Sequence, residues 1–240
     1  MAENNSQING QINGQINSQI NGQDIVPLLE NRFLKAYDLQ YAPGKHYFEA
    51  SRRGADRLVA AMGGEEFRAL LPDAVTCAVI IKDAPDSAKL LLSYEYRYPC
   101  GRFLLSPPAG LIDPEDIEGR TAEEAVLCAA QREIEEETGL KIDRSRGDRL
   151  FMVNQALFSS PGMTDESNAI ACAVLNVPEN SQPDINYDGV SGTERFDGSV
   201  FIDRSGAIEI LKRGRDEKGN FFSVYTALVL MYFISGLWED

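Results

Sequence analysis

The sequence predicts a mixed α/β protein in which one sheet is flanked by helices. Four apolar runs have the length of buried strands: 74–81, 89–98, 150–158 and 170–177. Helical patterns come late and irregularly, at 206–213 and 221–238, and do not alternate with every strand. We therefore expect a mixed sheet covered by helices, and not a regular series of parallel βαβ units.

The N-terminal segment is expected to remain outside the fold. Residues 7–23 repeat a four-residue unit of Gln, Asn, Gly and Ile, which is too short for a solenoid and too polar for a core. We interpret residues 1–26 as a disordered tail, with a Gln/Asn-rich association segment as the alternative.

A small β subdomain is predicted next, over residues 27–70. Polar and apolar residues alternate at 31–40 and 45–51, and Ala42-Pro43-Gly44 between them is typical of a tight turn. The pattern predicts a β-hairpin. Residues 71–240 then form the main domain.

The C-terminal part begins with a Gly/Asp-rich loop at 187–198 and a short strand at 199–203. The apolar segment 221–238 reaches the lower length limit of a membrane span. Hydroxyl-bearing residues within it, and the acidic end Glu239-Asp240 after it, favour a buried terminal helix instead.

The charge balance is the unusual feature of the composition. With 37 acidic and 23 basic residues among 240, the net charge is −14. An acidic surface repels nucleic acids and anionic lipids, so neither is an expected partner. A phosphate-bearing ligand would require a local reversal of charge, which divalent cations commonly provide.

Four cysteines and one histidine limit the chemistry further. Cys77, Cys100, Cys128 and Cys172 form no C-x-x-C pair, and His46 is the only histidine, so a structural zinc site or a His-dependent triad is poorly supported. The first two dozen residues lack the basic and apolar regions of a secretory signal. We expect a cytoplasmic protein with reduced thiols.

An acidic stretch carries more than half of the net charge. Between residues 113 and 137 there are ten acidic residues and two arginines, a net of −8. A helix here places Glu133, Glu136 and Glu137 on one face, where like charges repel. Carboxylates in this number suit Mg²⁺ or Mn²⁺. Thr121 with Glu124 predicts a capping box at the helix start, and Gly139 a left-handed C-terminal residue.

These residues match the motif of a known family. The segment R-E-I-E-E-E-T-G at 132–139, preceded by P-A-G-L-I-D at 108–113, resembles the Nudix hydrolases. Three flanking segments resemble the ADP-ribose pyrophosphatase branch: S-R-R-G at 51–54, Y-R-Y-P at 96–99 and S-P-G-M-T-D-E at 160–166. The resemblance extends from about residue 31 to the C-terminus.

The resemblance implies a Nudix α/β/α sandwich with an N-terminal β-hairpin subdomain. It also implies Mg²⁺- or Mn²⁺-dependent hydrolysis of the diphosphate bond of ADP-ribose or a related ADP-sugar, giving AMP and a sugar phosphate. The implied metal ligands are the Ala109 carbonyl, Glu133, Glu136 and Glu137, and Arg132 holds the glutamates in place. Glu194, on the loop before the last strand, is the first candidate for the general base, and Glu136 is the second.

Substrate contacts and a homodimer with exchanged N-terminal strands are implied as well. Arg97, and Arg53 from the partner subunit, would contact the diphosphate, while Phe33 and Phe48 would stack on the adenine and Glu49 would contact its edge. Pro161 and Glu166 complete the implied substrate residues.

The sequence departs from the family pattern in three places. Twenty-one residues separate Gly110 from Arg132, where the family has thirteen. We assign the excess to the loop around 115–118 and to one additional helical turn near 126–129. The loop glutamate of the family becomes Arg120 or Glu124, and Ser106 replaces another glutamate.

Two alternatives remain open. The same chemistry could act on another nucleotide sugar or a dinucleotide, since pocket shape decides the leaving group. The chain could also be a Nudix-fold ligand-binding or regulatory module without activity, although the intact glutamates argue against it.

Overall fold

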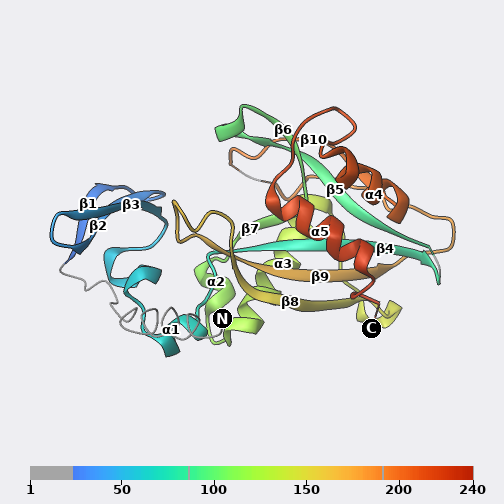
Figure 1. Ribbon diagram of the computed structural model, residues 1–240. Coiled ribbons are helices and arrows are strands. Elements are labelled where there is room, and N and C mark those ends of the chain that lie inside the picture. Colours follow the sequence, from blue (N-terminus) through green and yellow to red (C-terminus); the bar gives the residue numbers. More distant parts are fainter. Residues whose placement is uncertain (1–23, 86, 191, 240) are drawn as a thin grey trace, which may run out of the picture. The chain divides into compact units, whose positions relative to one another are not determined.

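The computed structural model describes residues 24–85, 87–190 and 192–239, so the repeat at 7–23 lies outside the described part. The described chain forms two compact units. The first contains residues up to Leu70 together with Ser160–Glu166, and the second contains the remainder (Figure 1).

The first unit is built on a three-stranded antiparallel sheet, β1 (Ile25–Glu30), β2 (Lys35–Ala42) and β3 (Lys45–Ser51), in that order. The predicted hairpin is present as β2 and β3. Strand β1 is not predicted by the sequence, and the prediction of a tail over residues 1–26 is wrong at Ile25 and Val26, which pair with β2 while Ile25 is buried in the core of this unit. One face of the sheet buries Ile25, Tyr37 and Leu39 against Leu58.

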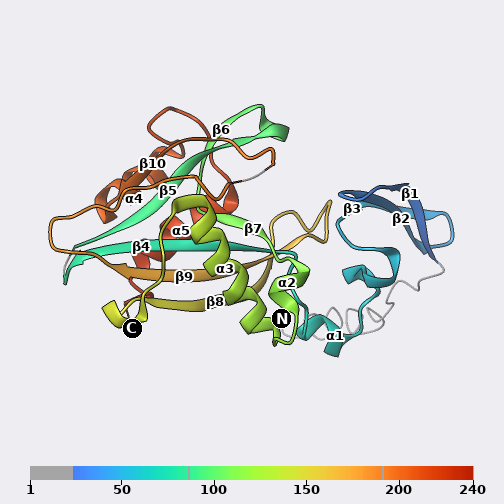
Figure 2. The same cartoon turned by 180° about the vertical axis from the view of Figure 1, so that it is seen from behind.

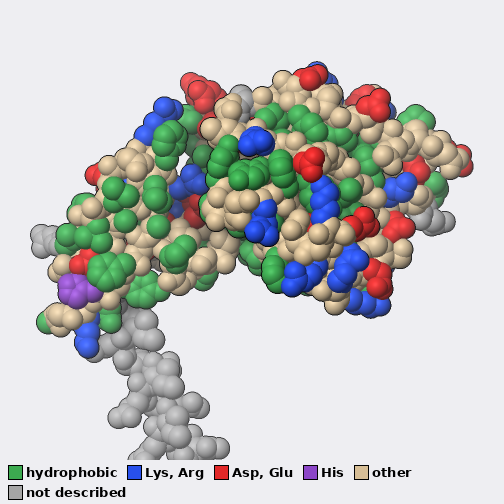
Figure 3. Space-filling model, turned by 90° about the horizontal axis from the view of Figure 1, so that it is seen from above, with side chains coloured by type: hydrophobic (Ala, Val, Ile, Leu, Met, Phe, Trp, Pro, Cys, Tyr) green, Lys and Arg blue, Asp and Glu red, His purple; other side chains and the backbone are tan. Residues whose placement is uncertain are grey.

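The opposite face of this sheet exposes apolar side chains. Val26 and Phe48 both pair with Asp38, so all three share one face, and Leu29 lies on the same face opposite Ala36. Val26, Leu29 and Phe48 are exposed, and in Figure 3 both hydrophobic and acidic side chains lie beside the chain's single histidine. We call Val26, Leu29 and Phe48 the apolar face of the first unit.

The segment Ser160–Glu166 lies along β3 within the first unit. The Ala50 amide donates a hydrogen bond to the Met163 carbonyl at 2.9 Å, and Ala50 pairs with Thr164 in a parallel bridge. The Tyr47 hydroxyl donates to the Gly162 carbonyl at 2.7 Å. These contacts attach the segment beside β3, at the edge of the three-stranded sheet.

The second unit contains a seven-stranded mixed sheet, in which the strand order is β10-β5-β4-β9-β8, with β6 paired to β5 and β7 to β4. β4 and β9 are parallel, and the other pairs are antiparallel. The strands are β4 (Ala74–Ala84), β5 (Ser87–Arg97), β6 (Arg102–Ser106), β7 (Ala109–Leu111), β8 (Arg149–Phe158), β9 (Ser167–Asn176) and β10 (Phe196–Ile202).

Helices cover both faces of this sheet, as Figures 1 and 2 show from opposite sides. Alternate residues of β4 point to opposite faces. Val75 and Val79 pack with α3 (Ala122–Thr138), and Ile80 lies in the core with α4 (Arg204–Arg213) and α5 (Val224–Ser235). The α/β/α sandwich predicted from the sequence is confirmed.

Several short elements complete the description. The short helices α1 and α2 and the strands β6 and β7 were not predicted. The bounds are α1 (Gly64–Arg68), α2 (Pro114–Ile117) and single 3₁₀ turns at Ala55–Arg57, Val59–Ala61, Tyr98–Cys100 and Arg144–Arg146.

The apolar C-terminal segment forms α5, whose Val229, Leu230 and Phe233 are buried against the sheet. This agrees with the prediction of a core helix. Within the described residues, the helices are too short or too polar for a membrane span. All four cysteines carry free thiols, and burial raises the pKa of Cys172 to about 12 and that of Cys77 well above its ordinary value.

Candidate functional site

The candidate site is built on α3, whose ends follow the predicted pattern. The Thr121 hydroxyl accepts a hydrogen bond from the Glu124 amide at 3.3 Å, and the Glu124 carboxylate accepts one from the Thr121 amide at 2.8 Å. Gly139 ends the helix with φ +72°, in the left-handed region that favours glycine. Both capping predictions are confirmed, and Glu124 is therefore used in the cap.

Arg132 connects the acidic groups of this helix. Its Nη1 donates to the Glu133 carboxylate at 2.7 Å and to the Glu136 carboxylate at 3.2 Å. Its Nη2 donates to Asp116 at 2.8 Å and to the Leu111 carbonyl at 2.9 Å. The guanidinium thus holds two of the three predicted glutamates to the loop that precedes the helix.

Glycine and backbone groups of β7 receive the other glutamate contacts. A side-chain carbon added to Gly110 would meet a Glu133 carboxylate oxygen at 2.0 Å, so this carboxylate lies directly over the glycine. The Glu137 carboxylate accepts a hydrogen bond from the Ala109 amide at 3.3 Å. The P-A-G segment can therefore lie against the glutamate face of the helix, because Gly110 has no side chain to separate the two.

Five carboxylates influence one another in this region. Burial raises the pKa of Glu133 to about 7 and that of Glu137 well above its ordinary value, and the charges of Glu136, Glu95 and Glu194 raise these values further. Burial likewise raises the pKa of Glu95 to about 7, although Arg97 opposes the shift. The negative charge is concentrated where water is scarce.

The donor set fits a divalent cation. Hard oxygen ligands that repel one another in a buried place are stabilised by a bound Mg²⁺ or Mn²⁺. Among the described residues, however, no three acidic, histidine or cysteine side chains are arranged to hold a metal ion. The reason lies in the contacts above: Arg132 binds Glu133 and Glu136, and Glu137 turns toward the Ala109 amide.

The sequence was compared with curated proteins and with family models. It is 35% identical over 96 residues to a Caenorhabditis elegans protein named as nudix hydrolase 2, and 29% identical over 126 residues to an uncharacterised Nudix hydrolase of Schizosaccharomyces pombe. These regions cover 39% and 52% of this chain. They span 37% and 54% of the two relatives. No family model matches the chain.

A solved structure titled ADP compounds hydrolase aligns with this chain over 88% of this chain's length and 92% of the length of the other chain. The TM-score is 0.51 and the sequence identity is 19%, which shows a shared fold. Over part of its length the chain is thus similar in sequence to proteins named as Nudix hydrolases.

Asp116 belongs to the candidate site but was not predicted from the sequence. The residue is 3% exposed, and its carboxylate accepts hydrogen bonds from Arg132 and from the Asp113 amide. Burial opposes ionisation, but the hydrogen bonds from Arg132 outweigh it and lower the pKa of Asp116. The sequence signal was Asp113-Pro114-Glu115-Asp116, an acid three residues after a helix N-cap.

The two residues proposed in place of the loop glutamate have other roles. Arg120 donates to the carbonyls of Glu115, Asp116 and Glu118, so it shapes the loop, and Glu124 caps α3. The loop contains α2, and α3 continues without interruption through 126–129.

Glu95 and Glu194 were not expected to act together. Glu95 lies on β5, and the loop residue Glu194 interacts electrostatically with Glu133 and Glu137. Burial raises the pKa of Glu194, and Arg97 opposes that shift. A glutamate within the apolar strand 89–98 was the signal for Glu95.

Ser106 lies outside this carboxylate group. Its side chain is buried, and its hydroxyl donates to the Leu104 carbonyl at 3.4 Å. Ser106 pairs with Ser93, and Leu104 pairs with Glu95, so Glu95 lies on the same face of the sheet two residue pairs away. A carboxylate is therefore present near the position where the family glutamate is missing.

The remaining predicted substrate residues, except Arg97, lie in the first unit. Arg53 is 8% exposed, and its Nη1 donates to the Asp165 carbonyl at 2.7 Å and pairs with the Asp165 carboxylate at 3.5 Å. Arg52 Nε donates to Glu166 at 2.5 Å. Arg53 and Glu166 thus form ion pairs within the first unit, and Arg97 forms one with Glu95 in the second unit.

Glu49 has an unusual environment in the first unit. Burial, reinforced by the charge of Asp165, raises the pKa of Glu49 to about 7, and Arg53 only partly opposes the shift. One oxygen of Glu49 and one of Asp165 are buried without a hydrogen-bond partner. Phe33 and Phe48 are exposed, and the Arg32 guanidinium lies 5.3 Å from the centre of the Phe33 ring. Pro161 lies in the segment attached to β3.

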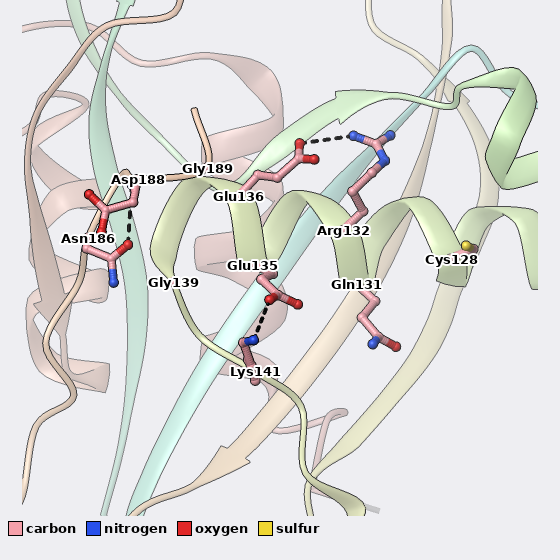
Figure 4. A pocket seen from close by; sticks show the side chains of 10 residues that line it. All are labelled: Cys128, Gln131, Arg132, Glu135, Glu136, Gly139, Lys141, Asn186, Asp188 and Gly189. Carbon is pink, nitrogen blue, oxygen red and sulfur yellow. Dashed lines mark hydrogen bonds and ion pairs between the residues drawn. The ribbon is translucent and has the colours of Figure 1, made fainter. Parts of the chain in front are cut away.

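A groove of about 760 Å³ runs along the outer side of α3 (Figure 4). Arg132 and Glu136 line it together with residues of the segment after β9. A side-chain carbon on Gly189 would meet the Glu136 Cα at 2.6 Å, and one on Gly139 would meet the Asn186 amide at 2.2 Å. Glycine at these two positions lets the segment lie directly on the C-terminal end of α3.

Proposed function

We propose that this protein is a metal-dependent Nudix diphosphatase that hydrolyses ADP-ribose or a related ADP-sugar to AMP and a sugar phosphate. The observation that carries the proposal is a group of carboxylates beside Arg97 and Arg132: Glu95, Glu133 and Glu137 are buried, Glu136 is half-buried, and the exposed Glu194 interacts electrostatically with them. A solvated acidic surface would leave these groups ionised in water. A buried excess of negative charge instead suits a cation that accompanies a diphosphate.

In the proposed mechanism, Glu133, Glu136, Glu137 and the Ala109 carbonyl would hold Mg²⁺ or Mn²⁺. When bound, the cation supplies charge neutralisation for the diphosphate oxygens. Arg132 keeps the glutamates in position, and Arg97 binds the diphosphate. Glu194 accepts a proton from the attacking water as its oxygen bonds to phosphorus and the bridging P–O bond breaks. The raised pKa of Glu194 suits a group that must take up a proton near neutral pH.

The first unit is proposed to bind the nucleoside. Phe33 and Phe48 present exposed rings that can stack on a base, and Glu49 has an unpaired buried oxygen that can accept a hydrogen bond. Phe48 pairs with Asp38 and Glu49 with Tyr37, so these two side chains lie on opposite faces of the sheet and would not contact the same base within one protomer. Pro161 and Glu166 belong to the neighbouring segment. Arg53 is engaged by Asp165, so its proposed contact with a partner's diphosphate requires that pair to open.

One assay separates the three functional readings. Purified protein is incubated with Mg²⁺ or Mn²⁺ and a panel of ADP-ribose, other nucleotide sugars and dinucleotides, and mononucleotide release is measured. Preferential AMP release from ADP-ribose supports the proposal, and a different preferred compound supports the broader Nudix activity. Retained binding without release indicates a non-catalytic module.

Two substitutions test the roles of the acids. Glu137→Gln is expected to abolish metal-dependent turnover, and full activity would remove Glu137 from the metal site. Glu194→Gln is expected to lower kcat strongly while metal affinity, measured by titration, stays close to the parent. An unchanged kcat would exclude Glu194 as the base and leave Glu136 as the candidate.

We also propose that the protein forms a homodimer through its first unit, with exchange of N-terminal strands. The apolar face of Val26, Leu29 and Phe48 supports this proposal, because exposed apolar residues grouped on one sheet face are typical of association surfaces. Nucleic acids and membranes remain improbable partners for a chain with a net charge of −14.

A further inference from the structure

The backbone on both sides of Glu194 is attached to the end of β5. On the N-terminal side, the Tyr98 hydroxyl donates a hydrogen bond to the Thr193 carbonyl at 3.2 Å. On the C-terminal side, the Tyr96 amide donates to the Arg195 carbonyl at 2.8 Å, and the Arg195 guanidinium lies 5.4 Å from the centre of the Tyr96 ring. Glu194 is therefore bracketed by two attachments to one strand end.

The tyrosines that make these attachments are themselves held by aromatic contacts. The rings of Tyr96 and Tyr98 meet edge to face, with centroids 5.0 Å apart, and Tyr96 meets Phe103 in the same manner at 5.2 Å. Phe103 pairs with Tyr96 across β6 and β5. Because edge-to-face aromatic contacts are favourable and fix ring orientation, the three rings form a defined support for the Glu194 segment.

The Tyr98 contact has the features of a functional attachment rather than of a core contact. Tyr98 is 57% exposed, so its hydrogen bond to a carbonyl competes with water and adds little to the stability of the fold. Its effect is local, since it determines where the peptide just before Glu194 lies. A misplaced catalytic group loses rate steeply with distance.

We propose that Tyr98 and Arg195 are positioning residues that fix Glu194 in the carboxylate group of the Nudix site. Tyr98 holds the chain before Glu194 through its hydroxyl, and Arg195 holds the chain after it through its carbonyl and its contact with Tyr96. Neither residue needs to touch the substrate. The inference rests on the proposed function, in which Glu194 accepts the proton.

Tyr98→Phe tests the proposal because it removes the hydroxyl and keeps the ring. We expect kcat to fall by about fivefold or more, with KM and the Mg²⁺ concentration at half-maximal activity unchanged. Tyr225→Phe is the matched control. The hydroxyl of Tyr225, on α5, also donates to a backbone carbonyl, that of Leu157 on β8, at 3.4 Å. The control should keep the parent's kcat. A Tyr98→Phe enzyme as fast as the parent overturns the proposal.

A double variant shows whether Tyr98 acts through Glu194. In a Glu194→Gln background, Tyr98→Phe should have no further effect on the residual rate, because the group it positions is already lost. An equal fold-loss in both backgrounds would mean that Tyr98 acts independently of Glu194, and it would refute the positioning role.

A second measurement does not depend on activity. Amide hydrogen exchange of residues 192–196 should be faster in Tyr98→Phe than in the parent and in Tyr225→Phe. Unchanged exchange overturns the proposed attachment even if the activity of the parent is confirmed. Faster exchange in a protein that hydrolyses no substrate supports the attachment and rejects only the proposed function.

Discussion

Removing the Asp116 side chain should weaken both the fold and the proposed binding of the metal ion. Asp116→Ala deletes a buried charge-assisted hydrogen bond from Arg132 at 2.8 Å and the cap on the Asp113 amide at 3.0 Å. The first is worth about 1.5–3 kcal/mol and the second about 1 kcal/mol. Arg132 keeps its bonds to Glu133 and Glu136, so a loss near the lower end, about 2.5 kcal/mol, is expected.

The functional effect follows from the partners that Arg132 retains. Without Asp116, the guanidinium is balanced by the exposed Asp113, 3.4 Å away, and by Glu133 and Glu136, the carboxylates assigned to the cation. It then competes more strongly with Mg²⁺ for their oxygens. We expect the Mg²⁺ concentration at half-maximal activity to rise about tenfold, which corresponds to about 1.4 kcal/mol of weakened binding.

Two measurements and one control test this reasoning. Thermal unfolding should show a Tm lower by about 5–10 °C, from about 2–4 °C per kcal/mol for a chain of this size. Asp203→Ala removes an N-cap contact to the Gly206 amide, 2.7 Å long, on α4, and it should lower Tm without changing the Mg²⁺ midpoint. An Asp116→Ala enzyme with the parent's Mg²⁺ midpoint would refute the link from Asp116 through Arg132 to the glutamates.

Three further substitutions address other parts of the structure. Gly110→Ala places a carbon 2.0 Å from the Glu133 carboxylate, so kcat should fall more than about tenfold; an active variant would show that this carboxylate can move freely. Glu49, whose pKa is raised from 4.5 to about 7 by burial, binds its proton more tightly when folded, so stability should be lost as pH rises through this interval. Glu49→Gln should flatten that loss in thermal unfolding at pH 5 and pH 8, and parallel curves would contradict it. Leu29→Lys should shift the protein from dimer to monomer in light scattering, and an unchanged mass would exclude the apolar face as the interface.

Helix α3 could be predicted closely from the sequence because the residues that define it are close together in the chain. Thr121, Glu124 and Gly139 define its ends within one turn, and the spacing of Glu133, Glu136 and Glu137 defines its acidic face. The long apolar strands were also recognisable, since residues of β4 are buried on both faces of the sheet.

The missing elements depend on contacts far apart in the sequence. β7 has only three residues, Ala109–Leu111, and exists because they pair with 74–76 of β4. Glu95 precedes Glu137 by 42 residues, so its place beside Glu137 follows from strand order and not from any local pattern. Asp116 was locally visible as a helix-capping acid, but its contact with Arg132 required the folded loop.

The discontinuity of the first unit has a consequence for folding during synthesis. Its sheet and core residues leave the ribosome within the first 70 residues, but the segment Ser160–Glu166 that lies along β3 appears about 90 residues later. Because domains tend to fold as they emerge, this unit must wait, with the β3 edge and the Asp165 partner of Arg53 unfilled, until most of the second unit has been made. The proposed nucleoside-binding residues therefore reach their final arrangement late, and the N-terminal unit cannot be isolated intact by cutting the chain after Leu70.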